Sequence, residues 1–422
     1  MTDRVPSEMG SNSPLALSYI LGLIVLAGFV ALAAIPSIVH LLGLNSVDGR
    51  WFLDSFAILA ANDALRQGLS PWENNPLDIL GRGHVYSAWW LSLGGLGLTR
   101  DHNFLFGVTS VGLFLAVAVA GVRPRTLGEV AGAAALMLSP PFLLAVNRAN
   151  NDLLIFALVG GGLLLVRYAG EWGRWSCLGV TIAAATGLKY YPIVAVAALG
   201  LMVRPLRRMW LVAGAVALLS LLVLLSVADR MAHGVLSLPD SLYTYGAAVL
   251  LRRLGWIGDM NAVWVVLGLL GAAGGVLAVR GITHGLADDR SGSVKVRAMF
   301  ATGALLLTGC FIAGESFAYR WLFALWLWPW LWRRTQGSPA DKAAVAALVL
   351  LGISIWGEGL FCLIVNLHGG FTGETVELWR ERWTWGIQTV HWLLMGLLAG
   401  WLGEAALSTL QEVRQRRTGP TV

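Results

Sequence analysis

Charged and amide side chains stand at the ends of apolar runs, where they could carry acid–base and anion-binding chemistry. Asp54 lies in a run of small apolar residues, and residues 147–152 read Asn-Arg-Ala-Asn-Asn-Asp before another apolar run. Lys189 separates two short apolar runs, and Tyr319-Arg320 opens a later one. A carboxylate can take the proton of a hydroxyl nucleophile, and fixed cations can hold an anion. Ionisable groups at such places are costly, so they indicate a functional site.

The three cations of this set are Arg148, Lys189 and Arg320. If they are unpaired and meet at one end of a helix bundle, they repel one another unless an anionic ligand lies between them. The alternative is that Asp152 and Glu315 neutralise the two arginines in helix-packing ion pairs. Lys189 could also extend its ammonium group to the lipid headgroups.

The composition shows which class of protein positions these residues. Of 422 residues, 57% are hydrophobic and only 13% are charged, where soluble proteins carry about 25%. Mean hydropathy is +0.69. These values exclude a cytosolic enzyme, a coiled coil and a disordered chain, and they predict an all-α polytopic membrane protein forming a single integral membrane domain, residues 1–422. The apolar run 15–42 is too long for a signal peptide and is interpreted as a retained first span.

The net charge of +6 reflects topology rather than nucleic-acid binding. Basic clusters such as Arg123-Pro-Arg125, Arg333-Arg334 and Arg414-Gln-Arg416-Arg417 lie between apolar runs, as cytoplasmic loops do. The prediction is about twelve transmembrane helices with both termini in the cytoplasm. The twelve expected spans are 15–42, 104–121, 128–146, 152–168, 176–188, 190–203, 210–228, 261–279, 298–313, 321–332, 343–366 and 385–407.

Two features of this threading are unusual. The spans 176–188 and 190–203 are too short to cross a bilayer alone, so they form either two short broken helices or one long kinked helix. The first outer segment, 45–103, contains an amphipathic pattern that predicts an interfacial helix ending at Gly68-Leu-Ser-Pro71-Trp72. Further outer loops are expected at 229–256 and 367–383. The many tryptophans are interpreted as interfacial belts.

Four sequence elements in this order resemble glycosyltransferase family 87, a family of GT-C membrane glycosyltransferases. They are Asp54 followed after fourteen residues by Gly68-x-x-Pro71-Trp72, the stretch Asn147-Arg-Ala-Asn-Asn-Asp152-Leu-Leu, Gly187-Leu-Lys189-Tyr-Tyr-Pro192, and Phe317-Ala-Tyr319-Arg320-Trp-Leu-Phe. The first resembles the outer-loop motif of the family, the third its Lys-x-x-Pro element, and the fourth the Tyr-Arg that opens a late span.

The resemblance implies a GT-C-like bundle and an inverting transfer of a sugar, with mannose favoured. The donor would be a polyprenyl-phosphate sugar, and the acceptor a glycolipid or cell-envelope glycan at the outer face of the plasma membrane. Asp54 would be the general base, with Asp48 as the other candidate. Arg148, Lys189 and Arg320 would bind the donor phosphate. Residues expected to contact donor or acceptor are His84, Asn147, Asn151, Asp152, Tyr190, Tyr191, Glu315 and Tyr319.

A transporter or a flippase for lipid-linked sugars is the alternative function, because it would also have many spans, buried charges and broken helices. The absence of an internal repeat and the long interfacial segment 45–103 favour an enzyme. No set of His, Asp or Glu residues has metal-ligand spacing, and the three cysteines lie in apolar runs. The expectation is therefore an enzyme with no cofactor, no essential metal and no nucleic-acid partner.

Overall fold

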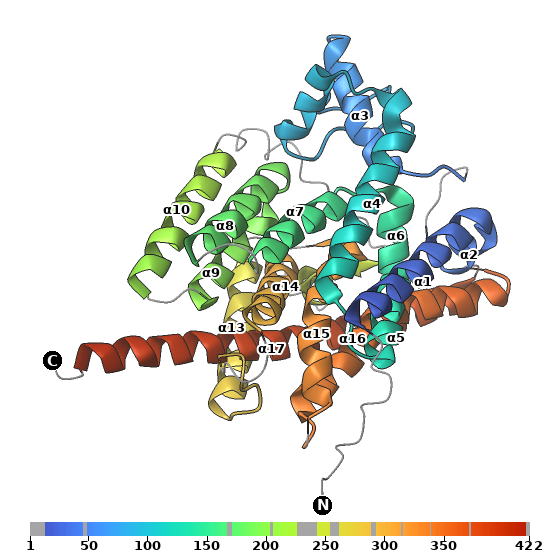
Figure 1. Ribbon diagram of the computed structural model, residues 1–422. Helices are drawn as coiled ribbons and strands as arrows, with labels where there is room; N and C mark the ends of the chain where they lie inside the picture. Colours follow the sequence, from blue (N-terminus) through green and yellow to red (C-terminus); the bar gives the residue numbers. More distant parts are fainter. Residues whose placement is uncertain are drawn as a thin grey trace, which may run out of the picture.

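The computed structural model describes most of the chain, and it is built almost wholly of helices (Figure 1). The described residues are 13–44, 49–166, 171–202, 206–225, 243–253, 261–287, 293–313, 315–337, 339–370 and 373–418. The elements of the first half are α1 (Pro14–Ala34), α2 (Pro36–Leu41), α3 (Leu53–Arg66), η1 (Ala88–Leu96), η2 (Arg100–His102), α4 (Asn103–Val122), α5 (Leu127–Met137), α6 (Pro140–Arg148), α7 (Asp152–Leu165), α8 (Glu171–Leu188), η3 (Tyr191–Ala195) and α9 (Val196–Met202).

The second half continues the helical architecture and adds one short strand pair. Its elements are α10 (Leu206–Leu225), β1 (Thr244–Tyr245), α12 (Ala247–Arg253), α13 (Asn261–Val279), α14 (Val294–Ala313), β2 (Ser316–Phe317), η5 (Ala318–Phe323), α15 (Ala324–Thr335), α16 (Lys342–Leu367) and α17 (Glu374–Thr418). β1 and β2 pair antiparallel, with Tyr245 opposite Ser316. This pairing holds the chain ahead of η5 against part of the predicted outer loop 229–256, of which residues 243–253 are described.

Five helices in the described residues are long and apolar enough to cross a membrane, or six if the bent pair α5–α6 counts as one span. The five are Pro14–Ala34, Arg100–Val122, Val294–Ala313, Lys342–Leu367 and Glu374–Glu412. Five further apolar helices of 10–17 residues are shorter than a full crossing requires. The predicted all-α membrane protein is thus confirmed, whereas the number of twelve spans stays a prediction.

Prolines explain why several predicted spans are broken. The first predicted span divides into α1 and α2 at Pro36, and the third bends by 56° between α5 and α6 at Pro140. Proline lacks the N–H that a helix interior needs, and it disfavours a helical residue before it. The ambiguous pair becomes two short helices, α8 and α9, joined through Lys189, Tyr190 and the 3₁₀ turn η3.

Two expectations from the sequence are wrong. The predicted loop 367–383 is helical from Glu374 onward, since the glycines that stop α16 end at Gly373 and the next residues contain no helix breaker. Glu377 and Arg380 form an ion pair one turn apart on this helix, at 3.0 Å. The tryptophans of α15 and η5 do not form an interfacial belt. Those that are fully or nearly fully buried in the helix core are Trp321, Trp326, Trp328 and Trp330.

The predicted interfacial helix of the first outer segment is α3, which lies with η1 above α4 and α6 at the top of Figure 1. Asn62 fastens the two elements together, because its amide donates to the Trp90 carbonyl at 3.0 Å and accepts from the Gly94 N–H at 2.7 Å. Asp63 on the same helix pairs with Arg66 and with Arg100. α3 is thus a fixed part of the fold.

Candidate active site

Asp54 lies in the first turn of α3 and is only 3% exposed. One carboxylate oxygen accepts from Arg148 Nε at 3.2 Å and from Arg82 Nη1 at 3.1 Å. The other oxygen accepts from Asn150 Nδ2 at 2.7 Å. A buried carboxylate needs such partners, so these contacts fix the orientation of Asp54.

The chain ahead of Asp54 has a conformation that docks α3 onto α6. Phe52 has a positive φ of 63°, and its N–H donates to the carbonyl of Asn147 at 2.8 Å. The ring of Phe52 packs on Gly107 of α4, where an added Cβ would lie 2.3 Å from it. Ser55 donates to the side chain of Asn103 at 2.6 Å. These contacts bring Asp54 to the end of α6, where Arg148 lies.

Asp152, at the start of α7, is the second buried carboxylate of the site. It pairs with Lys189 at 2.7 Å and with Arg320, and it accepts from the Tyr191 hydroxyl at 2.9 Å. The Arg320 guanidinium also lies 4.1 Å from the Tyr191 ring centroid. Removing one partner of a buried ion pair leaves an uncompensated charge, so Asp152 and its two cations act as one unit.

Asn150 connects the two carboxylate groups. Its Nδ2 donates to Asp54, while its Oδ1 accepts from the backbone N–H of Asp152 at 3.0 Å. Ala149 before it has a positive φ of 42°, which ends α6 and reverses the chain into α7. The stretch 147–152 is therefore the centre of the site.

The expectation of three unpaired cations is wrong. Arg148 pairs with Asp54, while Lys189 and Arg320 share Asp152. The alternative interpretation, neutralisation by carboxylates, is correct for Arg320 with Asp152. Glu315 instead pairs with Arg252 at 2.7 Å and takes no part in these contacts. The physical reason is desolvation, because cations this deeply buried require counter-charges when no ligand is present.

Tyrosine rings surround the Lys189 ammonium group. Its Nζ lies 5.3 Å from the ring centroid of Tyr86, 5.8 Å from that of Tyr319 and 6.0 Å from that of Tyr191. It also donates to Asn151 Oδ1 at 2.7 Å. Burial, and then the positive charge of Arg320, lower the pKa of Lys189 to about 8, against the opposing effect of Asp152. Lys189 is thus a cation whose charge is sensitive to mildly alkaline pH.

Several buried polar atoms at the site have no hydrogen-bond partner among the described residues. They are both side-chain polar atoms of Asn147, Nδ2 of Asn151, Nε of Arg320 and Nδ1 of His84. Such atoms are rare in folded proteins, and they indicate a place for water or ligand.

His84 is buried between the rings of Trp72 and Tyr86, at 5.3 and 5.8 Å. Its Nε2 is 3.1 Å from the Ser87 carbonyl, and burial lowers its pKa to about 4. His84 is therefore neutral at physiological pH and can offer its other ring nitrogen as a hydrogen-bonding group.

Two residues of this site were given no role from the sequence. Arg82 and Asn150 both donate to the Asp54 carboxylate. Tyr86, which could accompany His84 at the donor or acceptor, lies beside Lys189. One sequence feature could have identified Arg82: it stands between Gly81 and Gly83, four residues after Asp78. The Asp78 carboxylate pairs with Arg82 Nε at 2.9 Å. Tyr190 lies half-buried at the turn before η3. Asp48 is outside the described residues.

An apolar cavity of about 910 Å³ lies beside the charged groups. It is bounded by η1, α4, α7 and the end of α8, including Trp89, Trp90, Phe106 and Leu188. Trp90 Nε1 donates to the Leu188 carbonyl at 2.9 Å, immediately before Lys189 in the chain. The charged site and the apolar cavity thus share a wall.

Comparison with known families decides the class of protein. Residues 102–309 match the model of glycosyltransferase family 87. Over this region the chain is similar to glycosyltransferase family 87. The match confirms the resemblance, and with the apolar helices it supports a membrane glycosyltransferase that uses a sugar donor and an acceptor. Comparison with curated proteins and with solved structures gave no match.

The family 87 region contains only part of the site. Arg148, Asp152 and Lys189 lie within residues 102–309, while Asp54 and Arg320 lie before and after them. The fold brings the outer two to the matched three by direct ion pairs. In the described residues, no group of three or more His, Cys, Asp or Glu side chains is placed to hold a metal ion.

Proposed function

We propose that this family 87 glycosyltransferase moves a hexose, with mannose favoured, from a polyprenyl-phosphate carrier to a glycolipid or cell-envelope glycan. The observation that supports it is the shared wall between a buried carboxylate–cation network and an apolar cavity of about 910 Å³. A polyprenyl-phosphate sugar has a phosphate and a sugar for the network and a hydrocarbon tail for the cavity.

In this proposal Asp54 is the general base. The acceptor hydroxyl oxygen attacks the anomeric carbon and passes its proton to Asp54, while the bond from that carbon to the phosphate oxygen breaks with both electrons going to the phosphate. Attack opposite the leaving group inverts the anomeric configuration. Arg82 and Arg148 donate to one carboxylate oxygen and Asn150 donates to the other, so the carboxylate is held in place to receive the proton.

Arg148, Lys189 and Arg320 would stabilise the charge that grows on the departing phosphate. Their existing carboxylate partners keep them fixed before the donor binds, and fixed charges need little reorganisation in the transition state. The unpartnered atoms of Asn147, Asn151 and His84 would serve the hydroxyls of the sugar. The chemistry uses the protein's own cations and needs no metal, which treatment with EDTA tests.

Location follows from the same proposal. Nucleotide sugars stay in the cytosol, so a lipid-linked donor suits an active site on the outer face of the plasma membrane. Both termini would then be cytoplasmic. The direct test is purified protein in nanodiscs, incubated with a panel of labelled polyprenyl-phosphate sugars and a lipid extract. We expect label from one sugar in a new glycolipid or glycan, and no label from the whole panel would contradict the proposal.

A further inference from the structure

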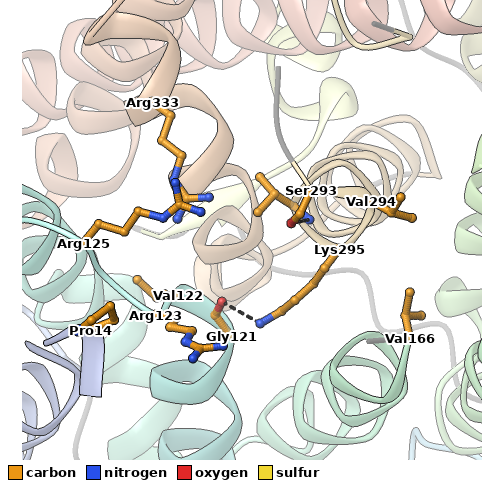
Figure 2. A pocket seen from close by; sticks show the side chains of 11 residues that line it. Pro14, Gly121, Val122, Arg123, Arg125, Val166, Ser293, Val294, Lys295 and Arg333 are labelled. Atoms are coloured by element: carbon orange, nitrogen blue, oxygen red, sulfur yellow. Dashed lines mark hydrogen bonds between the residues drawn. The ribbon is translucent and has the colours of Figure 1, made fainter. Parts of the chain in front are cut away.

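A second cavity, of about 500 Å³, lies far from the candidate active site and is rich in basic side chains (Figure 2). Its cations are Arg123 and Arg125 after α4, Lys295 in the first turn of α14, and Arg333 in the last turn of α15. Figure 2 shows the guanidinium groups of Arg125 and Arg333 extending toward each other.

The cavity lies at the opposite end of the helices that begin at the active site. α4 starts at Asn103, which binds Ser55 next to Asp54, and ends at Val122 in the cavity wall. α4 has 20 residues, which at about 1.5 Å each span about 30 Å, the thickness of a bilayer's hydrocarbon core. α7 likewise runs from Asp152 to the wall residue Val166. The cavity is therefore at the headgroup level of the other leaflet.

The charge of the cavity is only partly balanced among the described residues. Glu129 accepts from Arg333 Nε at 3.2 Å and from the backbone N–H of Arg125. Burial, and to a lesser degree the nearby charge of Arg125, lower the pKa of Arg333 despite Glu129. Lys295 Nζ donates to the carbonyls of Ala120 and Gly121 at 3.2 and 3.3 Å, where α4 ends. In the described part of the chain, Glu129 is thus the carboxylate that faces the three arginines of the cavity.

Apart from Ser293, the side chains that line the rest of the cavity are apolar, which matches an amphiphile rather than a small soluble anion. They are Pro14, Val122, Val166, Val294 and Val296. Val294 is 39% exposed and lies where α14, a candidate membrane span, begins. A ligand with a phosphate and an acyl chain would satisfy both halves of the wall.

We propose that this cavity binds the phosphodiester headgroup of an anionic phospholipid from the leaflet opposite the active site. Arg123 and Arg125 contact the phosphate from the α4–α5 turn, and Arg333 contacts it from α15. Basic pockets between membrane helices are suited to such headgroups, and each basic residue near an anionic membrane surface adds to the attraction. The bound lipid would join α4, α14 and α15, which carry the walls of the active site at their other ends.

Native mass spectrometry of the purified full chain tests this proposal. Wild type should keep one phosphatidylglycerol or cardiolipin molecule under conditions that remove phosphatidylcholine. The double variant Arg123→Ala/Arg125→Ala should bind the anionic lipid roughly tenfold or more weakly. Arg280→Ala, which removes an exposed arginine after α13, is the matched control and should bind as wild type does.

Two results would overturn the proposal. Equal retention of the anionic lipid by wild type and the double variant would remove these arginines from the binding site. Binding of free inorganic phosphate, with equal affinity for phosphatidylglycerol and phosphatidylcholine, would make the cavity a soluble-anion site. Thermal unfolding of both variants in detergent provides the check on folding, and a folded double variant that still gains stability from phosphatidylglycerol would also contradict the assignment.

Discussion

At the residue scale, the site combines two carboxylates with different partners. Asp54 is held by Arg82, Arg148 and Asn150, while Asp152 is held by Lys189 and Arg320. The first lies on the interfacial helix, where an acceptor can approach, and the second at the start of a core helix. This difference is the reason that the proposed function gives proton transfer to Asp54 and the organisation of the cations Lys189 and Arg320 to Asp152.

Asp54→Asn should lower the transfer rate by roughly 10²–10⁴ while polyprenyl-phosphate binding is retained, because the amide keeps the size and loses the basicity. The matched control is Asp63→Asn, which removes the same charge from the same helix and breaks the pairs with Arg66 and Arg100. Rate and donor affinity should be measured together. Near-normal turnover in Asp54→Asn with none in Asp48→Asn would move the base to Asp48.

Arg320→Lys should weaken donor binding by roughly tenfold, because lysine loses the planar group that faces both Asp152 and the Tyr191 ring. Arg334→Lys is the control, since Arg334 also lies over an aromatic ring, Trp330, and pairs with an aspartate, Asp341, away from the site. Titration of both variants with polyprenyl phosphate measures the effect. Equal affinities of the two variants for polyprenyl phosphate would show that Arg320 does not bind the donor.

The pH dependence of kcat/KM for the donor should show the titration of Lys189. Its pKa of about 8 means that the ammonium group is charged below this pH and neutral above it, so kcat/KM for the donor should fall as the pH rises through about 8. The charges that act on it are Asp152, Asp54 and Arg320. Lys189→Arg stays charged throughout and should lose this alkaline decline. An unchanged decline in Lys189→Arg would assign it to another group.

At the element scale, the apolar cavity depends on a close approach between α8 and η1. A Cβ at Gly187 would lie 2.3 Å from the Trp89 ring, so Gly187→Ala should displace this ring into or out of the cavity. We expect Gly187→Ala to lower kcat/KM more for long-chain than for short-chain donors. The measurement is the ratio of kcat/KM for the long-chain donor to kcat/KM for the short-chain donor. Gly161→Ala in α7, which meets nothing within 4 Å, should leave the ratio unchanged, and an unchanged ratio in Gly187→Ala would exclude the cavity from tail binding.

The sequence predicted elements well where apolar runs end at clear signals. The expected span 261–279 coincides with α13, and 104–121 differs from α4 by one residue at each end. The start of α17 was missed because the segment 374–383, which has the composition of a loop, is part of a helix that packs on α13 and α16. Arg82 was missed because its partner Asp54 is 28 residues away, and no local pattern records such a contact.

At the scale of the whole molecule, the fold gathers the ends of α3, α6, α7 and α8, the 3₁₀ helix η5 and the segment around Arg82 at one site. Charge balance there is a tertiary property, which is why the sequence identified Arg148, Lys189 and Arg320 but neither Arg82 nor the pairing of Arg148 with Asp54. Tryptophan in α15 shows the same limit: its abundance suits a membrane interface, and only packing around Phe300 and Trp401 makes Trp330 a core residue.

Topology can be tested with single cysteines in a background in which Cys177, Cys310 and Cys362 are replaced. Ser70 and Gln336 are both exposed, the first near α3 and the second after α15. An impermeant thiol reagent on intact cells should label Ser70→Cys, and should label Gln336→Cys only after the cells are opened. The reverse pattern would place the active site in the cytoplasm.

The measurement that tests the central claim most directly separates transfer from transport. Proteoliposomes are loaded with polyprenyl-phosphate sugar labelled in the sugar and with the acceptor fraction identified in the nanodisc assay. We expect label covalently attached to the acceptor and an equal amount of released polyprenyl phosphate, and both products should be lost in Asp54→Asn. Movement of intact labelled donor between leaflets, with no label on the acceptor and no effect of Asp54→Asn, would contradict it.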